Sequence, residues 1–221
     1  MYETLLAQPL FQGMSHSDLE QVVGHTRFDF SNVAAQELIA AEGERSDGIF
    51  FITAGTLSAT GESDDHSYSL CEHLSAPWTI EPERLFGLNP RYSRTYQAET
   101  SCRIFRIGKE DVVTLANQFE VFRLNLLNIY TTHAQRLSRQ VWHTPPQGIK
   151  EKIARFVAER CLVPVGEKTV DIKMTTLAHL IGESRLNVSH ALHALSEEGL
   201  ATLWRGGFCI SQLEHLLTSH H

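Results

Sequence analysis

The 221-residue sequence has no apolar run near the ~20 residues needed to cross a bilayer. Its first residues also lack the basic start and apolar stretch of a signal peptide. Only four cysteines are present, scattered at positions 71, 102, 161 and 209, so no CxxC metal site exists. Isolated cysteines of this kind are typical of small buried side chains in a reducing compartment. We therefore expect a cytoplasmic protein with no membrane association and no metal.

The chain also lacks a nucleophile–base pair, a metal-ligand spacing and a glycine loop that would cradle phosphate, so it predicts no enzyme and no catalytic residue. Its composition, 42% hydrophobic and 20% charged, is that of a globular protein. The net charge of −7 is unevenly spread, because residues 1–146 hold 11 basic and 18 acidic side chains and the remainder holds eight of each. The neutral C-terminal part can therefore still present a basic face.

The N-terminal half predicts one helix followed by many short strands. Residues 9–23 have helical periodicity, with Ser15 as N-cap and Asp18 three residues later. Period-two alternation then recurs in five stretches separated by Gly and Asp turn signals: 27–30, 48–53, 56–60, 67–71 and 101–107. Short strands at this spacing indicate a β-sandwich, a jelly roll or a barrel.

Residues 109–142 predict a long helix that is apolar on two faces. One stripe consists of Phe119, Phe122, Leu126 and Ile129, and the other of Leu127, Tyr130, Ala134, Leu137 and Val141. The second stripe has the spacing of a coiled-coil seam, so we expect it to pair with the same helix of a second subunit. The alternative is a helix held between two parts of one chain. Pro145 and Pro146 end the helix and mark a domain boundary.

Residues 174–195 predict a helix-turn-helix. Leu177, Ala178 and Leu180 lie on the apolar side of a first helix that begins near Thr175 or Thr176, and Gly182 ends it. Ser184 is a suitable N-cap for a second helix. Behind it, residues 200–203 and 208–210 predict a hairpin around Arg205-Gly206-Gly207, the wing of a winged domain. We expect Trp204 and Phe208 only to complete the core.

The outward face of the second helix is polar, but a helix face that is only exposed to solvent is polar as well. Arginine and asparagine can nevertheless read guanine and adenine edges, and serine and histidine can reach bases or phosphates. The residues expected to contact double-stranded DNA are Thr175, Thr176, Ser184, Arg185, Asn187, Ser189, His190 and Arg205.

Three segments together resemble the Crp/Fnr superfamily of bacterial transcriptional regulators: PLFQGMSHSDLEQV, EGERSDGIFFITAGTL and IGESRLNVSHALHALSEEGL. The resemblance implies an α+β fold with an antiparallel, jelly-roll-like β-roll for an effector (residues 1–108), a long dimerisation helix (109–144) and a winged helix-turn-helix (147–221). It also implies homodimers on a palindromic DNA site, with RNA polymerase as a further partner.

The resemblance places Arg185 where family members commonly have a base-reading arginine. Leu186 stands at a position that often holds an acidic residue, and His190 at one that often holds arginine, so the preferred DNA site should differ from the best-known one. His190 could make DNA binding respond to pH. The alternative is an effector-binding module that acts through protein partners without reading DNA.

The effector itself is not identified by the sequence. Cyclic-nucleotide-binding relatives have a Gly-Glu pair and then an Arg-Ser/Thr pair, but here Gly87 precedes Leu88, and Tyr92 stands at the arginine position. This argues against ordinary cyclic AMP, although a register shift could bring Arg91 or the Arg94-Thr95 pair into place. The effector-pocket candidates are Gly87, Arg91, Arg94, Thr95, Thr131 and Ser138.

The sequence also bears on two other sensor chemistries of the family. The clustered N-terminal cysteines of its iron–sulfur proteins are absent. Haem would need an axial ligand, for which His73, His133 and Cys71 are present, but lone histidines are more often surface residues. The sequence therefore does not identify a cofactor.

Overall fold

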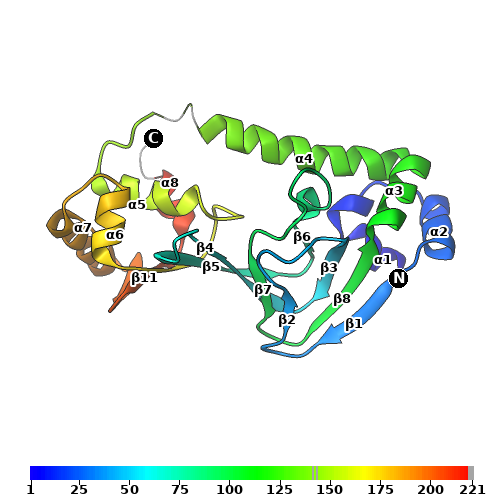
Figure 1. The fold of residues 1–221 in the computed structure, drawn as a ribbon, viewed down its shortest axis with the longest axis horizontal. Helices are drawn as coiled ribbons and strands as arrows, with labels where there is room; N and C mark the ends of the chain where they lie inside the picture. The colour runs from blue at the N-terminus through cyan, green and yellow to red at the C-terminus, as the bar shows by residue number, and fades with distance from the viewer. Residues whose placement is uncertain (141, 143, 219–221) are drawn as a thin grey trace. The chain divides into compact units, whose positions relative to one another are not determined.

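The computed structural model describes residues 1–140, 142 and 144–218. The chain forms two compact units, the first made of Met1–Ser58 and Leu74–Val141 and the second of Ala59–His73 and Trp142–His221. Figure 1 labels most of their helices and strands. A short segment from the N-terminal half thus belongs to the second unit, whereas the sequence analysis placed all of residues 1–108 in the roll.

The first unit opens with three short helical segments, α1 (Tyr2–Leu6), the 3-10 turn η1 (Pro9–Phe11) and α2 (His16–His25). Ser15 caps α2 as predicted, because its hydroxyl accepts from the Asp18 N–H at 3.1 Å and its own N–H donates to the Asp18 carboxylate at 3.3 Å. The predicted helix follows its Ser15 cap as α2, whereas Pro9–Phe11 form the separate turn η1, with Gly13 at φ +80° between the two.

The strands of the roll are antiparallel. They are β1 (Asp29–Val33), β2 (Leu38–Ala40), β3 (Gly48–Ala54), β4 (Thr56–Glu62), β5 (Tyr68–Ser75), β6 (Trp78–Ile80), β7 (Thr95–Ala98) and β8 (Cys102–Gly108). One sheet has the order β1-β8-β3-β6 (Figure 1), and it stacks the rings of Phe51 and Phe105 at 4.6 Å. β2 pairs with β7. The α+β fold with an antiparallel roll is therefore confirmed.

Two helices follow the roll, α3 (Lys109–Gln118) and α4 (Glu120–Gln140). The prediction of one continuous helix is wrong, because Phe119 between them is extended (φ −116°, ψ 110°) and its side chain is buried. This break lets Leu115 and Phe122 face the same core. That core also contains buried side chains of the N-terminal helices and the sheet, among them Leu10, Phe11, Ile49, Phe51 and Phe105.

The second unit is built around three strands and four helices of the C-terminal part. They are α5 (Ile149–Ala158), β9 (Lys168–Ile172), α6 (Met174–Leu180), α7 (Arg185–Glu197), β10 (Ala201–Trp204), β11 (Gly207–Ile210) and α8 (Leu213–Thr218). β11 pairs with both β10 and β9. The core includes Val157, Leu177, Val188 and Phe208. The predicted helix-turn-helix and hairpin are confirmed, whereas β9 and α8 were not predicted.

Residues of the β4–β5 hairpin complete this second unit. β5 pairs antiparallel with β9, and Leu70 enters the same core. The fully buried carboxylate of Glu72 accepts a hydrogen bond from the Leu162 N–H at 2.9 Å (Oε2) and faces the buried Lys168 across the strand pair. Because a buried carboxylate needs such partners, the hairpin is fixed to the second unit by polar as well as apolar contacts.

Candidate functional site

The turn between α6 and α7 is set by backbone hydrogen bonds around Gly182. This glycine has φ +67° and its N–H donates to the His179 carbonyl at 3.3 Å, while the Glu183 N–H donates to the Ala178 carbonyl at 2.9 Å. The pair of bonds is a Schellman motif, which ends α6 and sends the chain directly into the next helix. The two helices lie beside each other in Figure 1.

The start of α7 is exposed and carries most of the predicted DNA contacts. Ser184 caps the helix, because its hydroxyl accepts from the Asn187 N–H at 3.1 Å. Arg185, Asn187 and His190 are exposed, whereas Ser189 is half-buried. Of the two threonines in the first turn of α6, Thr175 is exposed and Thr176 is half-buried.

The β10–β11 hairpin forms the predicted wing. Arg205 is exposed at its tip, next to Gly206 with φ +98°. A Cβ at Gly207 would come within 2.7 Å of the Trp204 ring, so this position has no room for a side chain. Phe208 is buried as expected, but the core position assigned to Trp204 is wrong, since this side chain is 41% exposed and lies on the wing.

Ion pairs neutralise some of the charged side chains in the described part of the second unit and leave others without a partner of opposite charge. Lys152 contacts Glu183 at 2.6 Å and Lys150 contacts Glu198 at 2.5 Å, so both of these carboxylates are neutralised. The hydrogen bond from Lys152, with a further one from the Asn187 side chain, holds the pKa of Glu183 below its usual range. Within the described residues, Lys173, Arg185 and Arg205 have no such carboxylate partner. The exposed cations therefore lie at the helix-turn-helix and the wing.

The two stripes of the long helix differ in their surroundings. Phe122 and Leu126 are buried in the core of the first unit, whereas Leu127 is 50% and Leu137 53% exposed and Ala134 is also exposed. Tyr130 is half-buried instead, because its hydroxyl donates to the Pro82 carbonyl at 2.9 Å and its ring packs on the roll. Val141 lies outside the described residues.

The predicted effector residues differ in their partners and exposure. Arg91 donates to the Gly43 carbonyl at 2.7 Å, Thr95 accepts from the Glu42 N–H at 3.2 Å, and Thr131 donates to the Leu127 carbonyl of its own helix. Gly87 and Ser138 are exposed, and Arg94 is half-buried. Tyr92, at the position of the expected arginine, is buried with its hydroxyl 3.4 Å from the Gly48 carbonyl.

The polar centre inside the roll is a residue that the sequence analysis missed. The carboxylate of Glu81 follows β6 and is buried, with its side chain 1% exposed. It accepts hydrogen bonds from the Ser93 N–H at 2.8 Å, the Ser93 hydroxyl at 2.6 Å and the Tyr96 hydroxyl at 3.0 Å. Burial and the charge of Glu81 raise the pKa of Tyr96 well above its usual value. The sequence offered no signal for this residue, because the three-residue strand β6 before it is too short to be recognised.

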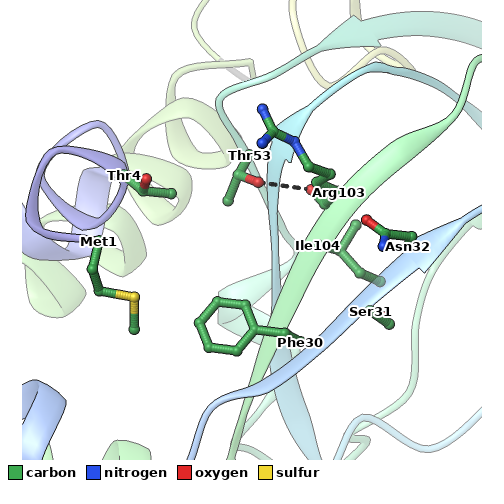
Figure 2. A pocket seen from close by; sticks show the side chains of 8 residues that line it. All are labelled: Met1, Thr4, Phe30, Ser31, Asn32, Thr53, Arg103 and Ile104. Carbon is green, nitrogen blue, oxygen red and sulfur yellow. Dashed lines mark hydrogen bonds between the residues drawn. The ribbon is translucent and has the colours of Figure 1, made fainter.

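A separate surface hollow of about 320 Å³ lies on the roll and is shown in Figure 2. It is lined by residues of α1, β1, β3 and β8: Met1, Thr4, Phe30, Ser31, Asn32, Thr53, Arg103 and Ile104. None of the predicted effector residues lines it. In the described part of the chain no three His, Cys, Asp or Glu side chains are grouped to hold a metal ion, and no helix there is long and apolar enough to span a membrane.

Comparisons with known proteins agree with this architecture. Residues 30–119 match the family model of the cyclic nucleotide-binding domain, while no curated protein sequence matches the chain. Among solved structures, the Thermus thermophilus Catabolite Activator Protein is similar with 18% identity and a TM-score of 0.52, over 95% of this chain and 97% of that one.

Two further structures are similar. A Eubacterium rectale protein assigned to the crp/fnr family of transcriptional regulators has 16% identity and a TM-score of 0.51, over 95% of this chain and 96% of its own. The sensor domain of the Pseudomonas aeruginosa transcriptional regulator DNR has 17% identity and a TM-score of 0.52, over 66% of this chain and 94% of its own. The resemblance to the Crp/Fnr superfamily is thus confirmed at the level of the fold, and residues 30–119 match the model of the cyclic nucleotide-binding domain.

Proposed function

We propose that the chain is a transcriptional regulator that binds a palindromic DNA site as a homodimer, with α7 in the major groove. The observation that carries this proposal is the exposed, carboxylate-free position of Arg185 at the first residue of α7, beside a wing that ends in Arg205. A helix start with an arginine can enter the groove and contact guanine O6 and N7, and the wing arginine can contact phosphate.

The other exposed residues take supporting roles. Asn187 hydrogen-bonds Glu183, so reading adenine would require it to leave this carboxylate, and Arg185 is the main base reader. His190 lies further along α7, where it can reach a base edge or a phosphate. Lys173, Thr175 and Thr176 at the start of α6 contact the DNA backbone, which positions α7 without reading sequence.

The dimer is formed by the exposed stripe of α4, Leu127, Ala134 and Leu137. Two subunits related by a two-fold axis would place their α7 helices in successive major grooves, about 34 Å apart. The roll controls this dimer, and RNA polymerase is the expected partner on DNA.

A second candidate function is favoured by one observation. Leu186 is 64% exposed in the middle of the proposed reading face, where an apolar side chain suits a protein partner better than a phosphate backbone. In this case the protein is a regulatory module that acts through other proteins and does not read DNA.

Selection from a random-sequence duplex pool at low salt separates the two candidates. The proposed function predicts an enriched palindromic motif, and a pool without any enriched motif would leave only the second candidate. Arg185→Ala should then weaken the selected site by ~1–3 kcal/mol, roughly 5- to 150-fold, and relax specificity at one position per half-site.

Lys173→Ala is the matched control, because a phosphate contact should weaken all sequences uniformly and reduce the salt dependence. If Arg185→Ala also weakens all sequences uniformly, Arg185 contacts only phosphate and the reading role assigned to it is wrong.

A further inference from the structure

The interior of the roll contains a set of hydrogen-bond donors that converge on a single anion. One backbone N–H and two hydroxyls, from Ser93 and Tyr96, lie 2.6–3.0 Å from the two oxygens of the Glu81 carboxylate. The Arg84 Nε lies 3.9 Å from the same group. Donors arranged in this way around a buried site bind carboxylate or phosphate oxygens.

The chain delivers its own anion to these donors by an unusual backbone conformation. Glu81 has φ 33° and ψ 57°, in the left-handed region that few residues other than glycine adopt. Pro82 follows directly and begins the turn η2 (Pro82–Arg84). The strain is tolerated because the inward carboxylate satisfies three donors that would otherwise be buried without a partner.

An external anion could not use the same donors without first moving Glu81. If the carboxylate stayed nearby, its negative charge would repel the incoming anion in a site with little water. If it left, its three hydrogen bonds would be lost, and with them the contacts that hold the backbone before η2. The Pro82 carbonyl of this turn accepts the hydrogen bond from Tyr130 of α4, so the occupied site also fixes α4 to the roll.

We propose that Glu81 is a built-in ligand of the roll: its carboxylate occupies the Ser93–Tyr96 anion site, excludes phosphate-bearing effectors from it and holds η2 against α4 without an effector. The inference concerns the roll alone, so it holds whether or not α7 reads DNA. It also explains why a domain of the cyclic nucleotide-binding family need not bind a nucleotide here.

Glu81→Gly vacates the site, and glycine suits the left-handed backbone, so the variant should fold. We expect sodium acetate, compared with sodium chloride at equal ionic strength, to raise its melting temperature in a saturable manner. The rise should be roughly 2–4 °C at about five times the Kd of acetate. Inorganic phosphate should act in the same way, whereas the wild-type protein should respond to neither anion beyond the chloride reference.

Two matched variants test the assignment. Glu81→Gln keeps the site filled and should show no acetate response, and Glu81→Gly combined with Ser93→Ala removes one of the three donors, the Ser93 hydroxyl, and should weaken the response. An acetate response equal in wild type and Glu81→Gly would overturn the proposal.

A measurement on the wild type does not depend on any variant. Titration with cyclic AMP, followed by tryptophan fluorescence and calorimetry, should show no saturable binding at millimolar concentrations. Binding with a micromolar Kd that displaces Glu81 would overturn the proposal, even if the variants failed to fold.

Discussion

Leu137→Glu is the sharpest test of the subunit contact. Leu127 and Leu137 are ten residues apart on α4, at one a and one d position of a heptad pattern, and each is about half exposed. In a two-fold dimer that uses this face, each leucine would approach its counterpart near the axis. A glutamate at position 137 would therefore bring two carboxylates together.

The size of the effect can be worked from the exposure. Full burial of a leucine side chain is favourable by ~1.5–3 kcal/mol. Since about half of Leu137 is already covered within the subunit, dimerisation gains about 1 kcal/mol per leucine and about 2 kcal/mol per dimer. Two carboxylates at about 4 Å add roughly 4 kcal/mol of repulsion at an effective dielectric constant near 20. We expect the dimer Kd to rise by at least ~10³-fold.

Sedimentation equilibrium over a range of protein concentrations measures this Kd, and circular dichroism checks that the variant remains folded. Gln135→Glu, exposed and outside the apolar stripe, is the matched control and should leave the Kd within a fewfold of wild type. If Leu137→Glu sediments as a dimer of unchanged Kd, α4 is not the subunit contact. In that case the half-site spacing proposed above also loses its basis.

Three further changes test the fold and its pH dependence. Gly182→Ala should destabilise the second unit by about 1 kcal/mol in urea unfolding, because φ +67° strains an L-residue although the added Cβ meets no atom. The control is Gly24→Ala, in a helix and equally unobstructed, which should not destabilise the protein in the same experiment. Glu72→Gln removes the charge that strengthens the bond from Leu162 and should destabilise the second unit by about 2 kcal/mol, which limited proteolysis and urea unfolding would detect. Burial raises the pKa of Glu83, so the folded state holds this proton more tightly than the unfolded chain and loses stability as pH rises from about 4.5. Glu83→Gln should therefore raise the melting temperature at pH 7 and have no stabilising effect at pH 3, and a gain equal at both pH values would contradict the burial argument.

Those elements that have strong local patterns were predictable from the sequence. The capping box at Ser15 and the Gly182–Ser184 turn follow from side chains that act on neighbouring backbone groups, and both appear in the structure where the sequence places them. β2, β6 and β7 have only three or four residues each, too few for a period of two to be recognised. β6 lies beside the longer β3 and β7 beside the longer β4, while β2 pairs with β7, so these strands form through long-range pairing.

The predictions that failed did so because tertiary contacts overrode the local sequence pattern. The long helix breaks at Phe119 because its ring reaches the core only from an extended backbone, and the helical periodicity on either side conceals this. Trp204 lies against Gly207 on the wing, a contact that depends on the hairpin and not on hydrophobicity. The segment Ala59–His73 joins the second unit because β5 pairs with β9, and no local sequence pattern predicts this pairing.

Among the candidate residues of the roll too, those that follow a sequence pattern were predicted and those that depend on tertiary contacts were missed. The family pattern predicts the effector site near Arg91 and Arg94, because both are charged and lie close to the expected arginine position, which Tyr92 occupies. The polar centre instead depends on Glu81, whose role requires the left-handed backbone and the approach of Ser93 from twelve residues away. Neither condition can be read from spacing.

In the proposed dimer, α4 would contact both the roll and the partner subunit. The hydroxyl of the half-buried Tyr130 bonds to the turn that follows Glu81, and Tyr130 lies between the exposed Leu127 and Leu137 along the same helix. A roll that fills its anion site with its own carboxylate keeps this tyrosine, and hence this part of α4, in one arrangement. In the proposed dimer, a phosphate compound excluded from this site could not act through it, since a ligand shifts an equilibrium only through different affinities for the two states.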